Sequence, residues 1–334
     1  MRHTDWKRKL LAAGLCLVLA ITALTGCGSG GEEAGKTTVR VAGLKGPTSM
    51  GLLFLEQWND EGEARENYEF SMMTAADEIL PLMIQGEMDI ALIPANVASV
   101  LYNRTEGGIT VIDINTLGVL YMVSGDSSIS AAEDLRGRTI YLTGRGTTPD
   151  YVLHYILNGN GIDESEVTLE YRSEAAEVAA LLSENPEGIG LLPQPFVTAA
   201  CTQNEALSIV LDMTAEWAAL QGEGGSSLVT GVTVVRNAFL EEHEDAVRVF
   251  LEEHRQSAEE INGNVETGAA LAVEAGIIAS EAIAQKAIPS CNITCIDGDE
   301  MKQALSGYLR VLYEQEPSSV GGQMPGDDFY MLSD

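Results

Sequence analysis

Short apolar runs alternate with segments of helical periodicity over most of the chain. In the first third, strands are expected at 39–42, 68–72 and 89–93. Helices are expected at 50–59 and 77–85, and a third opens at Pro94. Apolar strands separated by helices favour parallel sheets that are covered on both faces.

The same rhythm restarts after residue 138. Strands are expected at 139–143, 167–171, 188–192 and 208–211, and the helices between them at 149–158, 174–183 and 194–202. Helices alone follow Asn237, at 241–260, 265–275, 280–287 and 299–314. Two similar units predict two doubly wound α/β lobes.

Two extended segments, 117–124 and 228–235, are the expected crossings between these lobes. The predicted limits are 37–120 together with 232–334 for lobe 1, and 121–231 for lobe 2.

The N-terminus combines a basic start with a short apolar core. Arg2 and residues 7–9 precede the apolar run 10–24, which is shorter than a membrane-spanning helix and is typical of a signal peptide. The run closes on residues 24–27 (LTGC), which resemble the bacterial lipobox. We therefore expect a signal peptide at 1–26, a lipid on Cys27 and a flexible tether at 27–36. The alternative is an ordinary signal peptide with an incidental cysteine.

The charge balance is strongly acidic. The net charge of the chain is −31, and loss of the signal, with four basic residues and one acidic residue, makes it −34. Such a surface argues against nucleic acid as a partner, because phosphates require lysine and arginine. It also argues against adhesion to anionic lipid, so the lipid on Cys27 would have to hold the protein at the membrane.

Three cysteines remain after Cys16 leaves and Cys27 is lipidated. Cys201 is expected in a helix and buried. Cys291 and Cys295 could form a disulfide if the chain turns there, or remain separate thiols. Without a clustered histidine these thiols predict no zinc site.

The histidines do not indicate a metal site either. His243 and His254 share a helix face but are separated by about 16 Å of helix, and a solvated role among glutamates is expected for both. His154 is a group at a pocket edge or a packing residue. No metal is predicted.

Loops rich in small residues follow several of the predicted strands. In open α/β sheets ligands bind at the carboxyl ends of strands, where helix N-termini offer free N–H groups. Any one such loop could be a turn with a helix cap, but two long loops, one in each lobe, favour a ligand site. Lys45 and Arg145 are the basic residues in these loops, and could pair with an acidic ligand or be solvated. The loops lie at 43–51 (GLKGPTSMG), 74–77 (TAAD), 94–96 (PAN), 144–150 (GRGTTPD) and 193–195 (PQP).

Enzyme signatures are missing from the sequence. It contains no Gly-x-Ser-x-Gly and no His-Glu-x-x-His, and Pro149 stands where a dinucleotide fingerprint needs its third glycine. We expect no catalytic activity and no cofactor.

Five segments resemble the solute-binding proteins of bacterial ABC importers, in the nitrate/sulfonate/taurine/thiamine-precursor branch with the type II periplasmic-binding fold. The segments are 43–51, 86–96 (GEMDIALIPAN), 134–140 (DLRGRTI), 144–150 and 192–196 (LPQPF). The chain departs from that pattern in having no clustered arginines and no cysteine-rich run.

The resemblance implies that a small molecule binds between two lobes that close about the crossings. The implied ligand-binding residues are Lys45, Gly46, Pro47, Thr48, Ser49, Met50, Ala75, Ala76, Asn96, Arg145, Gly146, Thr147, Thr148, Pro149 and Gln194.

The resemblance also implies a role. The protein would be an extracytoplasmic, lipid-anchored monomer that captures a small organic or oxyanionic solute and delivers it to an ABC permease coupled to an ATPase. A sensing receptor on the same fold is the alternative, and an enzyme derived from it is a third.

Overall fold

The computed structural model describes residues 35–222 and 224–332 of the 334-residue chain. Residues Thr37–Asp334 form one compact unit. The predicted signal peptide 1–26, Cys27 and most of the predicted tether lie outside the described residues.

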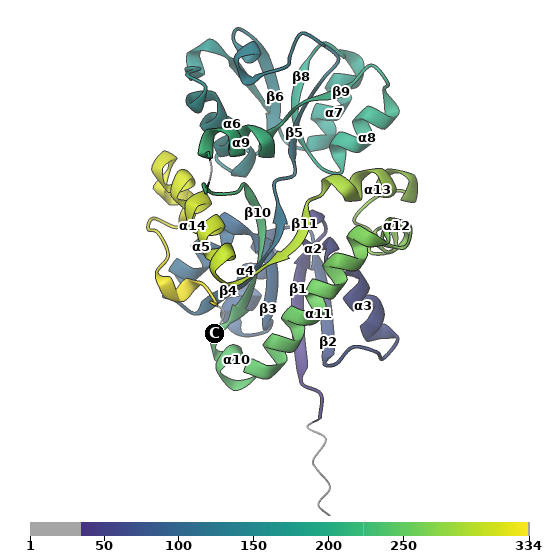
Figure 1. Cartoon of the computed structure of the whole chain (residues 1–334), viewed down its shortest axis with the longest axis vertical. Coiled ribbons are helices and arrows are strands. Elements are labelled where there is room, and N and C mark those ends of the chain that lie inside the picture. The colour runs from purple at the N-terminus through teal and green to yellow at the C-terminus, as the bar shows by residue number, and fades with distance from the viewer. Residues whose placement is uncertain (1–34, 223, 333–334) are drawn as a thin grey trace, which may run out of the picture. The chain divides into compact units, whose positions relative to one another are not determined.

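The first sheet has six strands in the order β11-β4-β10-β3-β1-β2 (Figure 1). The strands are β1 (Thr38–Leu44), β2 (Asn67–Met73), β3 (Ile90–Pro94), β4 (Ile109–Leu117), β10 (Val229–Arg236) and β11 (Ile293–Ile296). Strand β1 is parallel to β2 and β3. Strand β10 runs antiparallel to both β3 and β4, and β11 antiparallel to β4, so the sheet is mixed rather than wholly parallel.

The second sheet has five strands in the order β7-β6-β8-β5-β9. They are β5 (Leu120–Ser124), β6 (Thr139–Thr143), β7 (Thr168–Arg172), β8 (Ile189–Pro193) and β9 (Ser208–Asp212). Strand β6 is parallel to β7 and β8, whereas β5 is antiparallel to β8 and β9. We call each sheet with its helices a lobe, the six-stranded one first.

Helices follow most of the strands. They are α2 (Pro47–Met50), α3 (Leu53–Asp60), α4 (Ala76–Gln85), α5 (Ala95–Arg104), α6 (Thr148–Gly159), α7 (Ala175–Glu184), α8 (Phe196–Gln203), α9 (Met213–Gln221), α10 (Asn237–Glu242), α11 (Glu244–Gly263), α12 (Val265–Glu274), α13 (Glu281–Ala287) and α14 (Gly298–Gln315). No helix among residues 35–222 and 224–332 combines the length and apolarity needed to cross a bilayer.

Both faces of the first sheet are buried. In β3, Ala91 and Ile93 belong to one apolar cluster, and the intervening Ile90 and Leu92 belong to another. Because alternate residues of a strand point to opposite faces, helices must cover both sides of this strand. The predicted doubly wound α/β fold is confirmed.

The chain passes between the sheets twice. Strand β4 ends at Leu117 and β5 begins at Leu120, with Gly118 between them. A Cβ on Gly118 would lie 2.2 Å from Thr214 Oγ1, so this first crossing requires glycine. The second crossing leads from α9 to β10 at Val229.

Some predicted elements differ from the structure. The helix expected at 50–59 is two helices, α2 and α3, and the extended segment 117–124 is divided between β4 and β5. Strand β4, helix α9 and strand β11 have no counterpart among the predicted elements. The lobe limits 37–120, 121–231 and 232–334 remain a prediction.

Candidate functional site

The predicted loops of the first lobe come to one edge of its sheet. Strands β3, β1 and β2 are neighbours, so their carboxyl ends lie side by side. Lys45 N–H donates to Met73 O at 2.9 Å and links the loop after β1 to the end of β2. Figure 1 shows α2, which starts directly after Gly46, at the end of this lobe that faces the second lobe.

The α2 side chains point inward. Thr48, Ser49 and Met50 are all buried, and Met50 packs in an apolar cluster. Met50 is therefore inaccessible to a ligand in this arrangement. Ser49 Oγ and the buried Asn115 Oδ1 have no hydrogen-bond partner, although the Asn115 amide donates to Thr233 at 3.2 Å.

Ala75 and Asn96 already use polar groups within the protein. Ala75 N–H donates to the carboxylate of Glu78 at 2.9 Å, and Thr74 Oγ1 donates to the same oxygen. Asn96 Nδ2 donates to Ser319 O at 3.3 Å. The Asn96 amide therefore helps to hold the C-terminal segment on α5.

The long loop of the second lobe is closed by its own carboxylate. Asp150 accepts hydrogen bonds from Gly146 N–H at 2.7 Å and from Tyr171 Oη at 2.5 Å, and it lies 3.1 Å from His154 Nδ1. The Arg145 guanidinium lies over the Tyr171 ring, 4.1 Å from its centroid. The Asp150 carboxylate would repel an anion at this helix N-terminus, and the Gly146 N–H is not free to bind one because it already donates to Asp150.

The charges of this loop follow from these contacts. Burial raises the pKa of Asp150, but hydrogen bonds from His154, Gly146 and Tyr171 outweigh it and hold the pKa below its usual range. The hydrogen bond to Asp150 raises the pKa of His154 to about 9. At neutral pH the two form an ion pair, and Arg145 remains exposed beside them.

Gln194 joins the first crossing to a groove. Its N–H donates to Val119 O at 2.9 Å, and its side-chain oxygen accepts from Thr198 Oγ1 at 2.8 Å. The groove has a volume of about 520 Å³. Helix α8 and strand β9 form one side of it, and the end of α13 with the residues that follow forms the other. Cys201, which is half-buried rather than fully buried as predicted, lines it together with Lys286.

The two long loops are not joined by polar contacts within the described part of the chain. Among residues 35–222 and 224–332, no hydrogen bond or ion pair joins residues 45–50 to residues 145–149. The structure thus gathers the predicted residues into two sets, one on each sheet edge, with Gln194 beside a crossing.

His254 corrects the sequence analysis. We expected it to be solvated, but its side chain is completely buried and lies 3.1 Å from Asp113 Oδ2. The buried residues of α11 recur every three or four positions, and His254 belongs to that series. Cys291 and Cys295 are unpaired thiols. A zinc site was not expected because no histidine was predicted near the thiols, but His254 and Asp113 lie close to Cys295.

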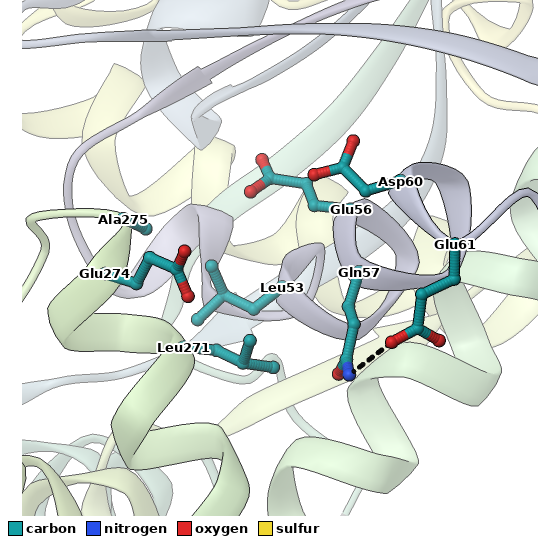
Figure 2. Close-up of a pocket in the computed structure, with 8 residues that line it drawn as sticks. All are labelled: Leu53, Glu56, Gln57, Asp60, Glu61, Leu271, Glu274 and Ala275. Carbon is teal, nitrogen blue, oxygen red and sulfur yellow. Dashed lines mark hydrogen bonds between the residues drawn. The ribbon is translucent and has the colours of Figure 1, made fainter.

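A second groove, of about 300 Å³, lies between α3 and α12 (Figure 2). Carboxylates from both helices line it, including Glu56, Asp60 and Glu274. Burial, with a smaller contribution from Asp60, raises the pKa of Glu56 to about 7. None of the predicted ligand-binding residues lines this groove.

Comparison with known proteins identifies the family. The NMT1/THI5-like family model matches residues 74–266, which is more than half of the chain. The chain belongs to the NMT1/THI5-like family. The matched range includes both crossings and the long loop of the second lobe. No curated protein matches the sequence.

Solved structures share the family's two-lobed fold. An ABC transporter protein from Parabacteroides distasonis is 25% identical with a TM-score of 0.74, over 90% of this chain and 100% of that one. The periplasmic aliphatic sulphonate binding protein SsuA from Escherichia coli is 14% identical with a TM-score of 0.69, over 89% and 94%. A putative sulfonate-binding SsuA from Methylobacillus flagellatus is 16% identical with a TM-score of 0.65, over 89% and 92%. The predicted resemblance to this group of binding proteins is confirmed.

Proposed function

We propose that the protein is the extracytoplasmic substrate-binding lipoprotein of an ABC importer. It captures a small organic or oxyanionic solute between its lobes and delivers it to a membrane permease. The observation that supports this most is the placement of the loops. Each sheet ends in glycine- and threonine-containing loops on its carboxyl edge, and the chain crosses between the sheets twice.

The two loop sets suggest how a solute would be held. Exposed Lys45 follows the first strand of one lobe and exposed Arg145 follows β6 of the other. A solute with acidic or polar oxygens would contact both lobes and supply the connection that the loops lack. Closure about Gly118 and the segment before Val229 would then bury it.

Ligand identification comes first in testing this function. Native mass spectrometry of the purified protein should find a small molecule that is retained through purification. A thermal-shift panel of sulfonates, nitrate, bicarbonate, aromatic acids and pyrimidines should raise the melting temperature with one class, because a ligand of the folded state stabilises it. Failure to retain or titrate any small molecule would count against the proposal.

Charge variants then locate the site. For an acidic solute, Lys45→Ala and Arg145→Ala should each weaken binding about tenfold or more, because a charge-assisted hydrogen bond contributes about 1.5–3 kcal/mol. Arg104→Ala, which removes an exposed cation of α5, is the matched control and should bind normally. Loss of binding only in Lys286→Ala would instead move the ligand to the groove beside Gln194.

A further inference from the structure

Three different metal-binding side chains converge inside the first lobe. Asp113 of β4, His254 of α11 and Cys295 of β11 place one donor atom each within 4.8 Å of one another. Asp113 and His254 are completely buried and Cys295 is partly buried. None of the three belongs to the loops of the predicted ligand site.

The arrangement orients two of the donors. Thr233 Oγ1 donates to Asp113 Oδ1 at 2.8 Å, which leaves Oδ2 directed at His254 Nδ1, 3.1 Å away. His254 Nε2 has no hydrogen-bond partner, so the contact with Asp113 is the ring's one polar interaction among the described residues. A buried imidazole with so little hydrogen bonding can exchange that contact for a metal ion.

We propose that Asp113, His254 and Cys295 form a binding site for a zinc ion. Thiolate, imidazole and carboxylate are the ligand types that Zn²⁺ takes in proteins, whereas Mg²⁺ and Ca²⁺ prefer oxygen alone. Ideal Zn–N and Zn–S bonds of about 2.0 and 2.3 Å in a tetrahedron place donors roughly 3.3–3.7 Å apart. Asp113 Oδ2 and His254 Nδ1, 3.1 Å apart, already lie this close, so Cys295 Sγ is the donor that has to approach.

Cys295 is the donor that can move. It lies on the edge strand β11, whose pairing with β4 is irregular between Ile293 and Ile296. A groove of about 180 Å³, lined by Cys295 and the exposed Glu259 among others, reaches the Cys295 side of the site. A water molecule or the Glu259 carboxylate would complete four-coordination.

Two features set the conditions for binding. Zinc binds cysteine as the thiolate, so the ion must displace the proton of the Cys295 thiol. The Arg255 guanidinium, which donates to Asp297 at 2.5 Å and to Cys295 O at 3.5 Å, repels a cation nearby. These costs suit a site filled by a strongly bound transition metal rather than by Ca²⁺ or Mg²⁺.

Metal binding would also fix the neighbourhood of the first crossing. Residues just before β11 contact it, because Tyr121 Oη donates to Ser290 O at 3.0 Å and Asn292 Nδ2 donates to Gly118 O at 2.5 Å. A metal that joins β11 to β4 and α11 would hold these contacts in place.

Metal titration of the full chain tests the site. After treatment with EDTA, the protein is titrated with Zn²⁺ against a chromophoric chelator, and separately with Co²⁺ in an absorption spectrometer. One tight Zn²⁺ equivalent and a near-ultraviolet sulfur-to-cobalt charge-transfer band are expected. The band reports thiolate ligation directly in the unmodified protein and does not depend on whether a variant folds.

Cysteine variants assign the donor. Cys295→Ser should abolish the cobalt band and weaken Zn²⁺ binding at least about tenfold. Cys201→Ser and Cys291→Ser remove the other thiols of the described chain and should leave both readouts unchanged. A missing charge-transfer band in the unmodified protein, or equal Zn²⁺ affinity in Cys295→Ser, would overturn the proposal. Both results are independent of the organic solute.

Discussion

Asp150 and His154 illustrate how one residue pair shapes the second-lobe loop. The carboxylate joins Gly146, Tyr171 and the imidazole, and the ring of His154 is 22% exposed. Because the carboxylate occupies the N–H of Gly146, a ligand at this loop should bind through hydroxyl groups such as those of Thr147 and Thr148, or through the Arg145 side chain.

The raised pKa of His154 predicts a pH-dependent stability. Its value of about 9 exceeds the ordinary 6.5, so its contribution is complete below pH 6.5 and disappears as the pH rises through 9. His154→Gln should lower the free energy of unfolding by about 1–2 kcal/mol below pH 6.5, allowing for partial exposure of the ring. Above pH 9 the two proteins should be equally stable.

Urea unfolding at several pH values measures this difference. His243→Gln is the control, because that histidine is exposed at the start of α11. A deficit in His154→Gln that stays constant from acidic to alkaline pH would contradict the assigned ion pair.

Gly231 provides a second prediction at this scale. A Cβ there would lie 2.4 Å from Asn115 Oδ1 and 2.5 Å from Thr48 Cγ2, both closer than van der Waals contact allows. Gly231→Ala should therefore destabilise the protein by about 1–3 kcal/mol and displace helix α2, which contains Thr48. Gly46→Ala is the matched control, since no atom lies within 4 Å and the backbone is extended with φ −179°. Equal melting temperatures for the two variants would show that the predicted clash is relieved.

At the scale of elements, one buried carboxylate connects three strands. Asp89, the residue immediately before β3, accepts from Arg40 Nη2 of β1 at 2.6 Å and from Arg236 Nη2 of β10 at 2.9 Å. Burial raises the pKa of Asp89, but the hydrogen bonds from the two arginines outweigh it and keep the pKa below 3.8. The carboxylate is therefore ionised throughout the physiological range.

Removing this carboxylate should cost more than removing any exposed one. Asp89→Asn leaves two arginines without their shared anion and should lower the free energy of unfolding by about 3 kcal/mol at neutral pH. The deficit should shrink as the pH falls below 3.8, where Asp89 of the unmodified protein begins to lose this contribution. Asp327→Asn, which removes the exposed partner of Lys302, should change little. Chemical unfolding that finds equal losses would refute the central role of Asp89.

Buried polar residues also explain why some features of the fold could not be predicted from the sequence. Strands β1, β3, β6 and β8 were predictable because their apolar runs are short and bounded by loops. Strand β4 is buried up to Thr116, yet Asp113, Asn115 and Thr116 interrupt its apolar pattern. Helix α11 is rich in glutamate, and its buried Glu253 and His254 resemble surface residues until Tyr68 Oη and Asp113 are seen to pair with them.

The candidate site was predictable at the level of loops but not of contacts. Strand ends placed Lys45 and Arg145 on sheet edges from the pattern alone. Nothing local indicated that the Asn96 amide would bond the C-terminal segment, or that Asp150 would fill its own loop. Such pairings join residues far apart in the chain or depend on side-chain geometry that periodicity does not encode.

On the scale of the whole molecule, the lobes share one apolar core. A continuous cluster includes Ile93 of the first sheet and Ile140 of the second. Helix α14 takes part in this junction, because Tyr308 packs against Trp217 of α9 with ring centroids 5.6 Å apart. If the lobes close about the two crossings as proposed, we expect this buried contact to persist and the lobes to pivot on the α14 side.

The strongly acidic charge makes the predicted lipid on Cys27 decisive for location. Without it, a body of net charge −34 has no electrostatic attraction to an anionic membrane. With it, the proposed diacyl anchor and the predicted tether would keep the protein at a high effective concentration near the proposed permease. Cys27→Ala should therefore shift the protein from the membrane fraction to the soluble extracytoplasmic fraction. Solute affinity should be unchanged, because the predicted ligand-binding residues all lie beyond residue 42.

Cell fractionation and mass spectrometry of the N-terminus measure this outcome. Cys16→Ala, inside the apolar core of the signal, is the matched cysteine control and should leave the protein in the membrane fraction. If Cys27→Ala also stayed with the membrane, an uncleaved N-terminal segment rather than a lipid would hold the protein. Release of the variant with full solute binding would show that membrane localisation and solute binding are separate properties. The first would depend on a single cysteine and the second on the two lobes.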